Sequence, residues 1–229
     1  MRSLRRPAGL IGFGLAAAFA VAENWSLPEF CWSTWLTGLA YSWACVLTAA
    51  VQILFTAGRQ RADYEDALPS LRALGPSAFL AGIALAVLLA GGIAFYVYTW
   101  LFGFYGLFLS VFAEMEPHAL FGRNGFINSD FFTPVQHLAG KFWPMVLGTL
   151  IANVDGLLQE RPWLRIVQPF RSSVMLRIHI LTIALPFVSL FAWALFGTAY
   201  QPVTIVLLLA VLYFLPQRAG PGQTIAPDR

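Results

Sequence analysis

The sequence predicts an all-α protein, a polytopic bundle of about six transmembrane helices of roughly 20 residues each. Two observations support this fold class. Of the 229 residues, 59% are hydrophobic and 11% are charged, whereas about 25% of the residues in a soluble domain are charged. The arginines also collect in alternate gaps between the hydrophobic runs. This pattern is typical of multi-span proteins, which keep Lys and Arg on the cytoplasmic side.

Charge asymmetry sets the expected orientation. The arginine-rich gaps hold Arg2, Arg5, Arg6, Arg59, Arg61, Arg72, Arg161, Arg165, Arg171, Arg177 and Arg218. The other gaps are acidic, with Arg123 and Lys141 as their cations. We therefore expect both termini to be cytoplasmic and the chain to be integral to a bacterial cytoplasmic (inner) membrane. The net charge of +3 sits in short loops, which suits lipid headgroups and disfavours nucleic acid as a partner.

The first hydrophobic run covers residues 7–22. Its basic start, short apolar middle and small-x-small end at Ala20-Val21-Ala22 are also typical of a cleaved signal peptide. We favour a retained first span anchored by Trp25, because retention gives an even number of spans with both termini inside. The second span is expected at residues 30–57, before Arg59.

The apolar stretch at residues 77–115 is too long for one upright crossing, since nearly 40 residues reach about 60 Å against a hydrocarbon core of about 30 Å. It forms either two spans or one span at about 78–98 followed by an aromatic extension along the outer interface. Two crossings would place the later arginine-rich gaps outside the cell. The charge rule therefore favours one span.

An aromatic-rich outer loop is expected at residues 114–133. A helix start follows it, with Thr133 as cap, Pro134 at the first helical position and Gln136 three residues after the cap. The fourth span should reach about residue 158 and should kink near Pro144, because proline removes a backbone donor.

The last two spans are expected at residues 174–196 and 203–215, and Pro216 ends the sixth. Residues 1–216 would then form a single transmembrane helical domain. The tail at residues 217–229 is rich in Gly and Pro, so we expect a flexible cytoplasmic end.

Small residues at four-residue spacing predict close contacts between membrane helices, because they let two backbones approach. The clearest stripe is Gly148, Ala152 and Gly156 on the fourth span. Similar stripes are Gly12, Ala16 and Ala20 on the first span, and Gly82, Ala86, Ala90 and Ala94 on the third.

Ionisable residues inside spans are functional candidates, since burying charge in a membrane is costly. Asp155, near the inner end of the fourth span, is expected at the depth of Arg177 and His179 on the fifth. These three residues predict a buried polar cluster. It is either a proton or ligand site that opens to the cytoplasm or a structural tie between spans, and its closeness to the interface favours the tie.

His118 and His137, on the outer side, are the weak candidates for metal ligands, together with nearby acidic residues. Their spacing matches no zinc or iron signature. The sequence also contains no nucleophile elbow, phosphate-binding glycine loop or Cys-x-x-Cys motif. We therefore predict no catalytic residue and no resident metal.

Tryptophans gather around the second span, at Trp25, Trp32, Trp35 and Trp43. They predict either interface anchors or the lining of a site for a flat lipophilic molecule, such as a quinone, a pigment or a bound lipid. Interface anchoring is the favoured interpretation.

The segment from Pro169-Phe170-Arg171 to Ile183, together with the six-span plan, is similar to an uncharacterised family of bacterial membrane proteins of unknown function. The resemblance covers about the last third of the chain and implies no activity. That family carries Glu and His in its second and third spans, which invites a metal site. Here the corresponding stretches read Cys31-Trp32-Ser33-Thr34-Trp35 and Phe104-Tyr105-Gly106-Leu107-Phe108, so the resemblance implies a member that has lost such a site.

These observations favour a non-catalytic integral membrane subunit that packs against partner membrane proteins, lipids or a lipophilic cofactor. One alternative is a small transporter or channel, which needs a polar path through the midplane. Gln52, Thr149, Asn153 and Thr182 offer little material for such a path, and no inverted repeat is apparent. The other is a membrane metalloenzyme with its site in the outer loop.

Overall fold

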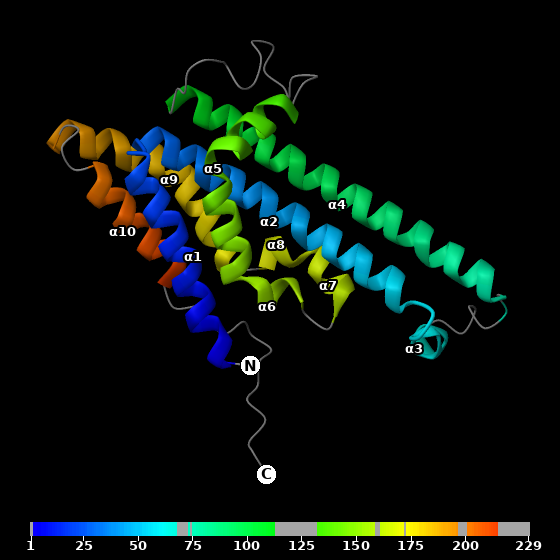
Figure 1. The fold of residues 1–229 in the computed structure, drawn as a ribbon. Coiled ribbons are helices and arrows are strands. Elements are labelled where there is room, and N and C mark those ends of the chain that lie inside the picture. The colour runs from blue at the N-terminus through cyan, green and yellow to red at the C-terminus, as the bar shows by residue number, and fades with distance from the viewer. Residues whose placement is uncertain are drawn as a thin grey trace.

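The computed structural model describes residues 2–67, 73, 75–112, 132–158, 161–171, 173–196 and 201–214. Within these ranges the regular elements are helices, which confirms the all-α class (Figure 1). The longer ones are α1 (Arg2–Ala22), α2 (Leu27–Thr56), α4 (Pro76–Phe112), α5 (Phe132–Ala152), α9 (Ser173–Phe196) and α10 (Gln201–Phe214). The short ones are α3 (Arg61–Ala67), α6 (Val154–Leu157), α7 (Pro162–Ile166) and α8 (Gln168–Arg171). Most of the expected outer loop, with His118, and the tail at 217–229 lie outside the described residues.

The central helix of the fold is α2. It contacts α4, α5, α7 and α9, and in Figure 1 it runs through the middle of the molecule beside α4. Residues 30–39 of this helix are all buried, and Trp32, Trp35 and Leu39 belong to the main hydrophobic cluster. Because this helix is enclosed on several sides, its apolar residues form no single stripe.

Two helices, α2 and the stretch Pro76–Val111 of α4, are long and apolar enough to cross a membrane. The apolar run after Pro76 forms one unbroken helix of 37 residues, about 55 Å long at 1.5 Å per residue. This continuity agrees with the interpretation of one span that is extended by aromatic residues.

The kink expected near Pro144 is confirmed, because Phe142 has non-helical dihedrals inside α5 (φ −107°, ψ 15°). The expected continuation of this span to about residue 158 is wrong. The helix ends at Ala152, and Asn153 leaves the helical region (φ −117°, ψ 19°) while its side-chain Nδ2 donates to the Thr149 carbonyl at 2.8 Å. The Asn153 backbone N–H donates to the same carbonyl at 3.1 Å. A side-chain bond of this kind to a nearby carbonyl disfavours continuation of the helix.

Small residues bring α1 against α5. A Cβ added to Gly12 would lie 2.3 Å from the Gly148 carbonyl oxygen, and a Cβ added to Gly148 would lie 2.6 Å from the Gly12 carbonyl oxygen. Ala16 and Ala20 continue the buried face of α1. α1 also contacts α10, whose Tyr213 ring would lie 3.0 Å from a Cβ added to Gly12, and Figure 1 shows α1 beside both α5 and α10.

Candidate functional site

Three short helices occupy the gap where an arginine-rich loop was expected. The segments α6, α7 and α8 fold back along α2, and Figure 1 shows them beside its second half. Arg165, in the last turn of α7, is completely buried. Its Nη2 donates to Oε1 of Gln52 on α2 at 2.7 Å. Because the interior disfavours the charged form, desolvation lowers the pKa of the Arg165 guanidinium.

Neighbouring hydrogen bonds fix this segment to the long helices α2 and α4 and to the short helix α3. The Tyr98 hydroxyl on α4 donates to the Ile166 carbonyl at 2.8 Å. The indole of Trp163 donates to the Tyr64 hydroxyl at 3.1 Å. Farther along, Gln168 Nε2 reaches the Tyr41 hydroxyl of α2 at 3.5 Å. The arrangement therefore places a polar cluster inside the bundle, beside the second half of α2.

Sequence reasoning missed this cluster because it counted Arg165 as a marker of membrane topology. One signal could have revealed it. Gln52 is an amide within a long apolar helix, and such a group needs a polar partner when it leaves water. The segment at 162–170 is also rich in apolar and aromatic residues, unlike an exposed loop.

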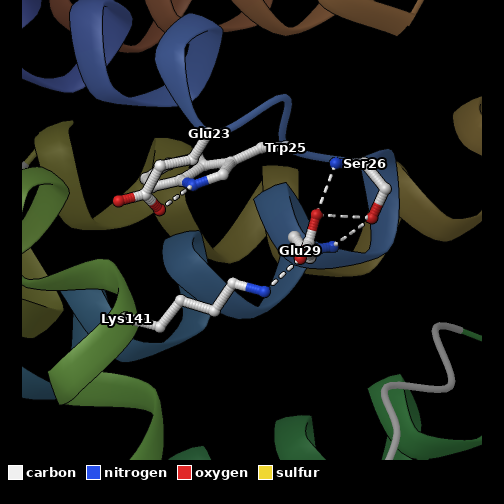
Figure 2. A network of polar contacts seen from close by, with 5 residues as sticks. All are labelled: Glu23, Trp25, Ser26, Glu29 and Lys141. Atoms are coloured by element: carbon white, nitrogen blue, oxygen red, sulfur yellow. Dashed lines mark hydrogen bonds and ion pairs between the residues drawn. The ribbon is translucent and has the colours of Figure 1, made fainter.

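A second polar network holds the start of α2 against α5 (Figure 2). Ser26 and Glu29 form a capping box, in which the Ser26 backbone N–H donates to Glu29 Oε2 at 2.6 Å and the Glu29 N–H donates to Ser26 Oγ at 3.4 Å. The other Glu29 oxygen pairs with Nζ of Lys141 on α5. Trp25 donates to Glu23 and packs edge-on against Phe142, with ring centroids 5.1 Å apart.

This network has a structural explanation. A capping box satisfies amide groups that the first helical turn leaves unpaired. The Lys141 ammonium group also lies 5.7 Å from the centroid of the Phe142 ring, at the kink of α5. The contacts thus fix the entry to α2 and the bend of α5 to each other.

The third feature is the junction of α2, α4 and α9. A Cβ added to Gly38 would lie 2.6 Å from Phe102 on α4 and 2.7 Å from Ile178 on α9. The Trp35 indole donates to the Phe102 carbonyl at 2.6 Å. His179 lies beside this junction, with its ring centroid 5.8 Å from Phe102 and 5.2 Å from Tyr105.

The predicted grouping of Asp155, Arg177 and His179 stays a prediction. Asp155 lies in α6 and not in the fourth span, because α5 ends early. Arg177 Nη1 donates to the Leu212 carbonyl of α10 at 3.0 Å, which satisfies one of the carbonyl groups that the last turn of a helix leaves open. His179 packs on α4 instead. Arg177 and His179 therefore have different neighbours.

The small residues predicted as a packing stripe on the fourth span contact different parts of the protein. Gly148 faces α1, as described above, whereas a Cβ added to Gly156 would lie 2.9 Å from Gln168 Nε2 of α8. Ala152 is the last residue of α5 and is half-buried. Only Gly148 of the three is thus placed in a long helix pair.

The structure describes only one of the two histidines that were predicted as weak metal candidates. His137 is exposed on α5, whereas His118 lies outside the described residues. Among the residues that are described, no group of three His, Cys, Asp or Glu side chains is arranged to hold a metal ion. Cys31 and Cys45 are both buried and free.

Comparison with known proteins gives no relative. No family model matches the chain, and neither a curated protein nor a solved structure matches it at a significant level. The resemblance to a six-span bacterial family therefore remains a prediction.

Proposed function

We propose that this chain is a non-catalytic integral membrane subunit that packs against partner membrane proteins and lipids. The proposal includes about six spans, both termini in the cytoplasm and a place in a bacterial inner membrane. The charge asymmetry of the sequence supports the orientation. The outward surface of the helices supports the membrane environment.

That outward surface is the main observation. Large apolar side chains point away from the bundle along two helices. They are Leu80, Leu85, Leu88, Leu89, Ile93, Tyr96 and Val97 on α4, and Leu176, Ile180, Ile183, Phe187, Leu190, Phe191 and Trp193 on α9. Leu88 is 72% exposed and Phe191 is 68% exposed. Large exposed apolar side chains in this number are typical of contact with lipid or another protein.

The exposed face of α4 also offers room for another helix. Gly82 is exposed there, and a Cβ added to it would meet nothing within 4 Å. Ala86, one turn farther along the same face, is also exposed. In lipid, where burying apolar area gives helices no preference for each other, small residues supply the close approach that drives association. This face therefore supports a partner subunit at α4.

Photo-crosslinking in native membranes tests the proposal. A photoreactive amino acid in place of Leu89, on the exposed part of α4, should give one discrete adduct with a second protein. The same amino acid in place of Phe55, which is 81% exposed on α2, is the matched control and should react mainly with lipid. The adduct is identified by mass spectrometry after gentle detergent extraction.

Two results would contradict the proposal. Release of the chain from membranes by alkaline carbonate would refute the integral location. Lipid adducts alone at residue 89, equal in yield to those at residue 55, would refute the partner at α4 while leaving the membrane location intact.

The alternative of a small transporter or channel would rest on the polar cluster around Arg165 and Gln52. Flux of a polar solute in proteoliposomes that is lost in Arg165→Met would favour that alternative. The metalloenzyme alternative depends on His118, outside the described residues, and gains no further support from the exposed position of His137.

A further inference from the structure

An apolar strip is exposed along the second half of α2. Its members are Leu47, Val51 and Phe55. They are four positions apart, so they lie on one face of the helix. Arg59, four positions after Phe55, is exposed in the turn that follows the helix, where its backbone N–H donates to the Thr56 carbonyl at 2.9 Å. This α2 strip therefore leads from apolar side chains to a cation.

Two more charged side chains belong to the same end of α2. The indole of Trp163 on α7 donates to the Tyr64 hydroxyl on α3 at 3.1 Å. Arg161 comes two residues before Trp163, and Asp63 is next to Tyr64, and both charged residues are exposed. Figure 1 places α3 past the end of α2. The hydrogen bond therefore brings the backbone of Arg161 and the backbone of Asp63 to this end.

The segment from Arg161 to Gln168 runs against the direction of α2. Arg165 donates to Gln52 at 2.7 Å, whereas Gln168 reaches Tyr41, which comes earlier in α2, at 3.5 Å. The chain thus passes from the end of α2 back toward its middle. Arg161, at the start of the segment, lies toward the end of α2, as the turn that holds the other exposed arginine does.

Both exposed arginines are open to an anion. Neither Arg59 nor Arg161 takes part in an ion pair within the described part of the chain. By contrast, the guanidinium of Arg61 lies over the Phe79 ring, 5.4 Å from its centroid. In the proposed orientation this end of α2 meets the inner leaflet, and arginine binds phosphate through paired N–H groups.

We propose that the end of α2 binds a glycerophospholipid whose headgroup carries a primary ammonium, such as phosphatidylethanolamine. The phosphate pairs with Arg59 and Arg161, the ammonium pairs with Asp63, and an acyl chain lies along the α2 strip. The ammonium of this headgroup lies beyond the phosphate, just as α3 lies beyond the end of α2 (Figure 1). This inference rests on the membrane location and the orientation in the proposed function, and it names the lipid.

The carboxylate decides the headgroup. A primary ammonium carries three N–H donors for an oxygen such as those of Asp63. The quaternary ammonium of phosphatidylcholine has none. Phosphatidylglycerol has no cation and would leave the carboxylate beside the lipid phosphate, where like charges repel.

Native mass spectrometry of the full-length protein tests the site. The protein is titrated in detergent with the dioleoyl forms of phosphatidylethanolamine, phosphatidylcholine or phosphatidylglycerol, and the Kd of the first bound lipid is measured. The ethanolamine lipid should bind about fivefold more tightly than either of the others. A factor of about five corresponds to about 1 kcal/mol, the upper end of the range for an exposed ion pair.

Substitutions separate the two parts of the headgroup. Arg59→Gln and Arg161→Gln each remove a phosphate contact, so each should raise the Kd of all three lipids, by up to about fivefold. Asp63→Asn should raise the Kd of the ethanolamine lipid to that of the choline lipid, whose own Kd should stay unchanged. All three side chains are exposed, so these variants should fold, which the midpoint of thermal unfolding checks.

The matched control is Arg61→Gln. It removes the same charge two positions from Arg59, but from a guanidinium that already lies on the Phe79 ring, so each Kd should stay unchanged. If this variant unfolds at a lower temperature, Lys141→Gln takes its place. Lys141 pairs with Glu29 in the first turn of α2, at the opposite end of that helix.

Three outcomes would overturn the inference. The first is an equal Kd for the three lipids in the wild type, which would show an unselective lipid shell. The second is an equal rise in Kd for the control and for Arg59→Gln, which would show general attraction between charges and no site. The third is tightest binding of phosphatidylglycerol with no effect of Asp63→Asn. Each would leave the membrane location intact, because extraction with alkaline carbonate tests that separately.

Discussion

At Gly12 and Gly148 the backbones of α1 and α5 touch, and neither position has space for a single extra carbon. The atom that a Cβ would meet is a carbonyl oxygen of the opposite helix, at 2.3 Å from Gly12 and 2.6 Å from Gly148. A backbone atom cannot rotate away as a side chain would. Tyr213 closes the same place from α10, and its hydroxyl lies 3.0 Å from Thr149 Oγ1.

We expect Gly148→Ala to destabilise the protein by about 1–3 kcal/mol, the usual cost of overpacking. The loss appears as a lower midpoint of thermal unfolding in detergent. The control is Gly14→Ala on α1, where an added Cβ meets nothing within 4 Å. Equal midpoints for the two variants would contradict the close contact between α1 and α5.

At the scale of elements, α7 is the least ordinary part of the fold. A five-residue helix is too short to be stable alone, so its position depends on contacts with α2 and α4. Gln52 and Tyr98 supply these contacts through the Arg165 side chain and the Ile166 carbonyl. The arginine thus acts as a tie between a connecting segment and a long helix.

A double-mutant cycle of Arg165→Met and Gln52→Leu should reveal this tie. Each single variant leaves a buried polar group with one partner fewer, whereas the double variant removes both. The coupling energy should fall in the range of about 0.5–3 kcal/mol for residues in contact, measured by denaturant unfolding in mixed micelles. Arg161→Met, at an exposed arginine of the same gap, should show no coupling to Gln52→Leu.

The sequence predicts the elements better than it predicts the connections. The second span was expected at 30–57 and α2 covers Leu27–Thr56, because a long apolar run has few ways to satisfy its backbone other than a helix. The kink near Pro144 follows from the missing N–H of proline. The end of α5 at Ala152 was not foreseen, since it depends on the side chain of Asn153 bonding backward.

The candidate sites were harder to predict than the helices. His179 was identified from its residue type alone, but its contacts with Phe102 and Tyr105 come from a helix about 75 residues earlier in the chain. Burial of Arg165 likewise depends on Gln52, 113 positions away. Pairings at such separations depend on how the helices pack, which a single sequence does not encode locally.

At the scale of the whole molecule, orientation in the membrane is the prediction on which most others rest. We expect single cysteines that replace Arg161 and Ser3 to react with a membrane-impermeant thiol reagent only after the cells are opened. A cysteine at His137, exposed on α5, should react in intact cells. The native Cys31 and Cys45 are buried, so the unsubstituted chain serves as the control.

Labelling of residues 161 and 3 from opposite sides would contradict the arrangement of six spans with both termini inside. It would also move the Arg165 cluster to the other half of the bilayer.

In the proposed membrane setting, the length of α4 affects how the helix is placed among lipids. A straight rod of about 55 Å is longer than a hydrocarbon layer of about 30 Å is thick, so a lean of the helix would reduce the length of the aromatic end that extends beyond the layer. Tyr98 and Trp35 bind it to α7 and α2, and these neighbours therefore lean with it. Longer acyl chains would bring the whole group closer to vertical, so bilayer thickness would change the tilt of α4. Polarised infrared spectroscopy in thin and thick bilayers would measure the mean helix tilt, which should fall as the bilayer thickens.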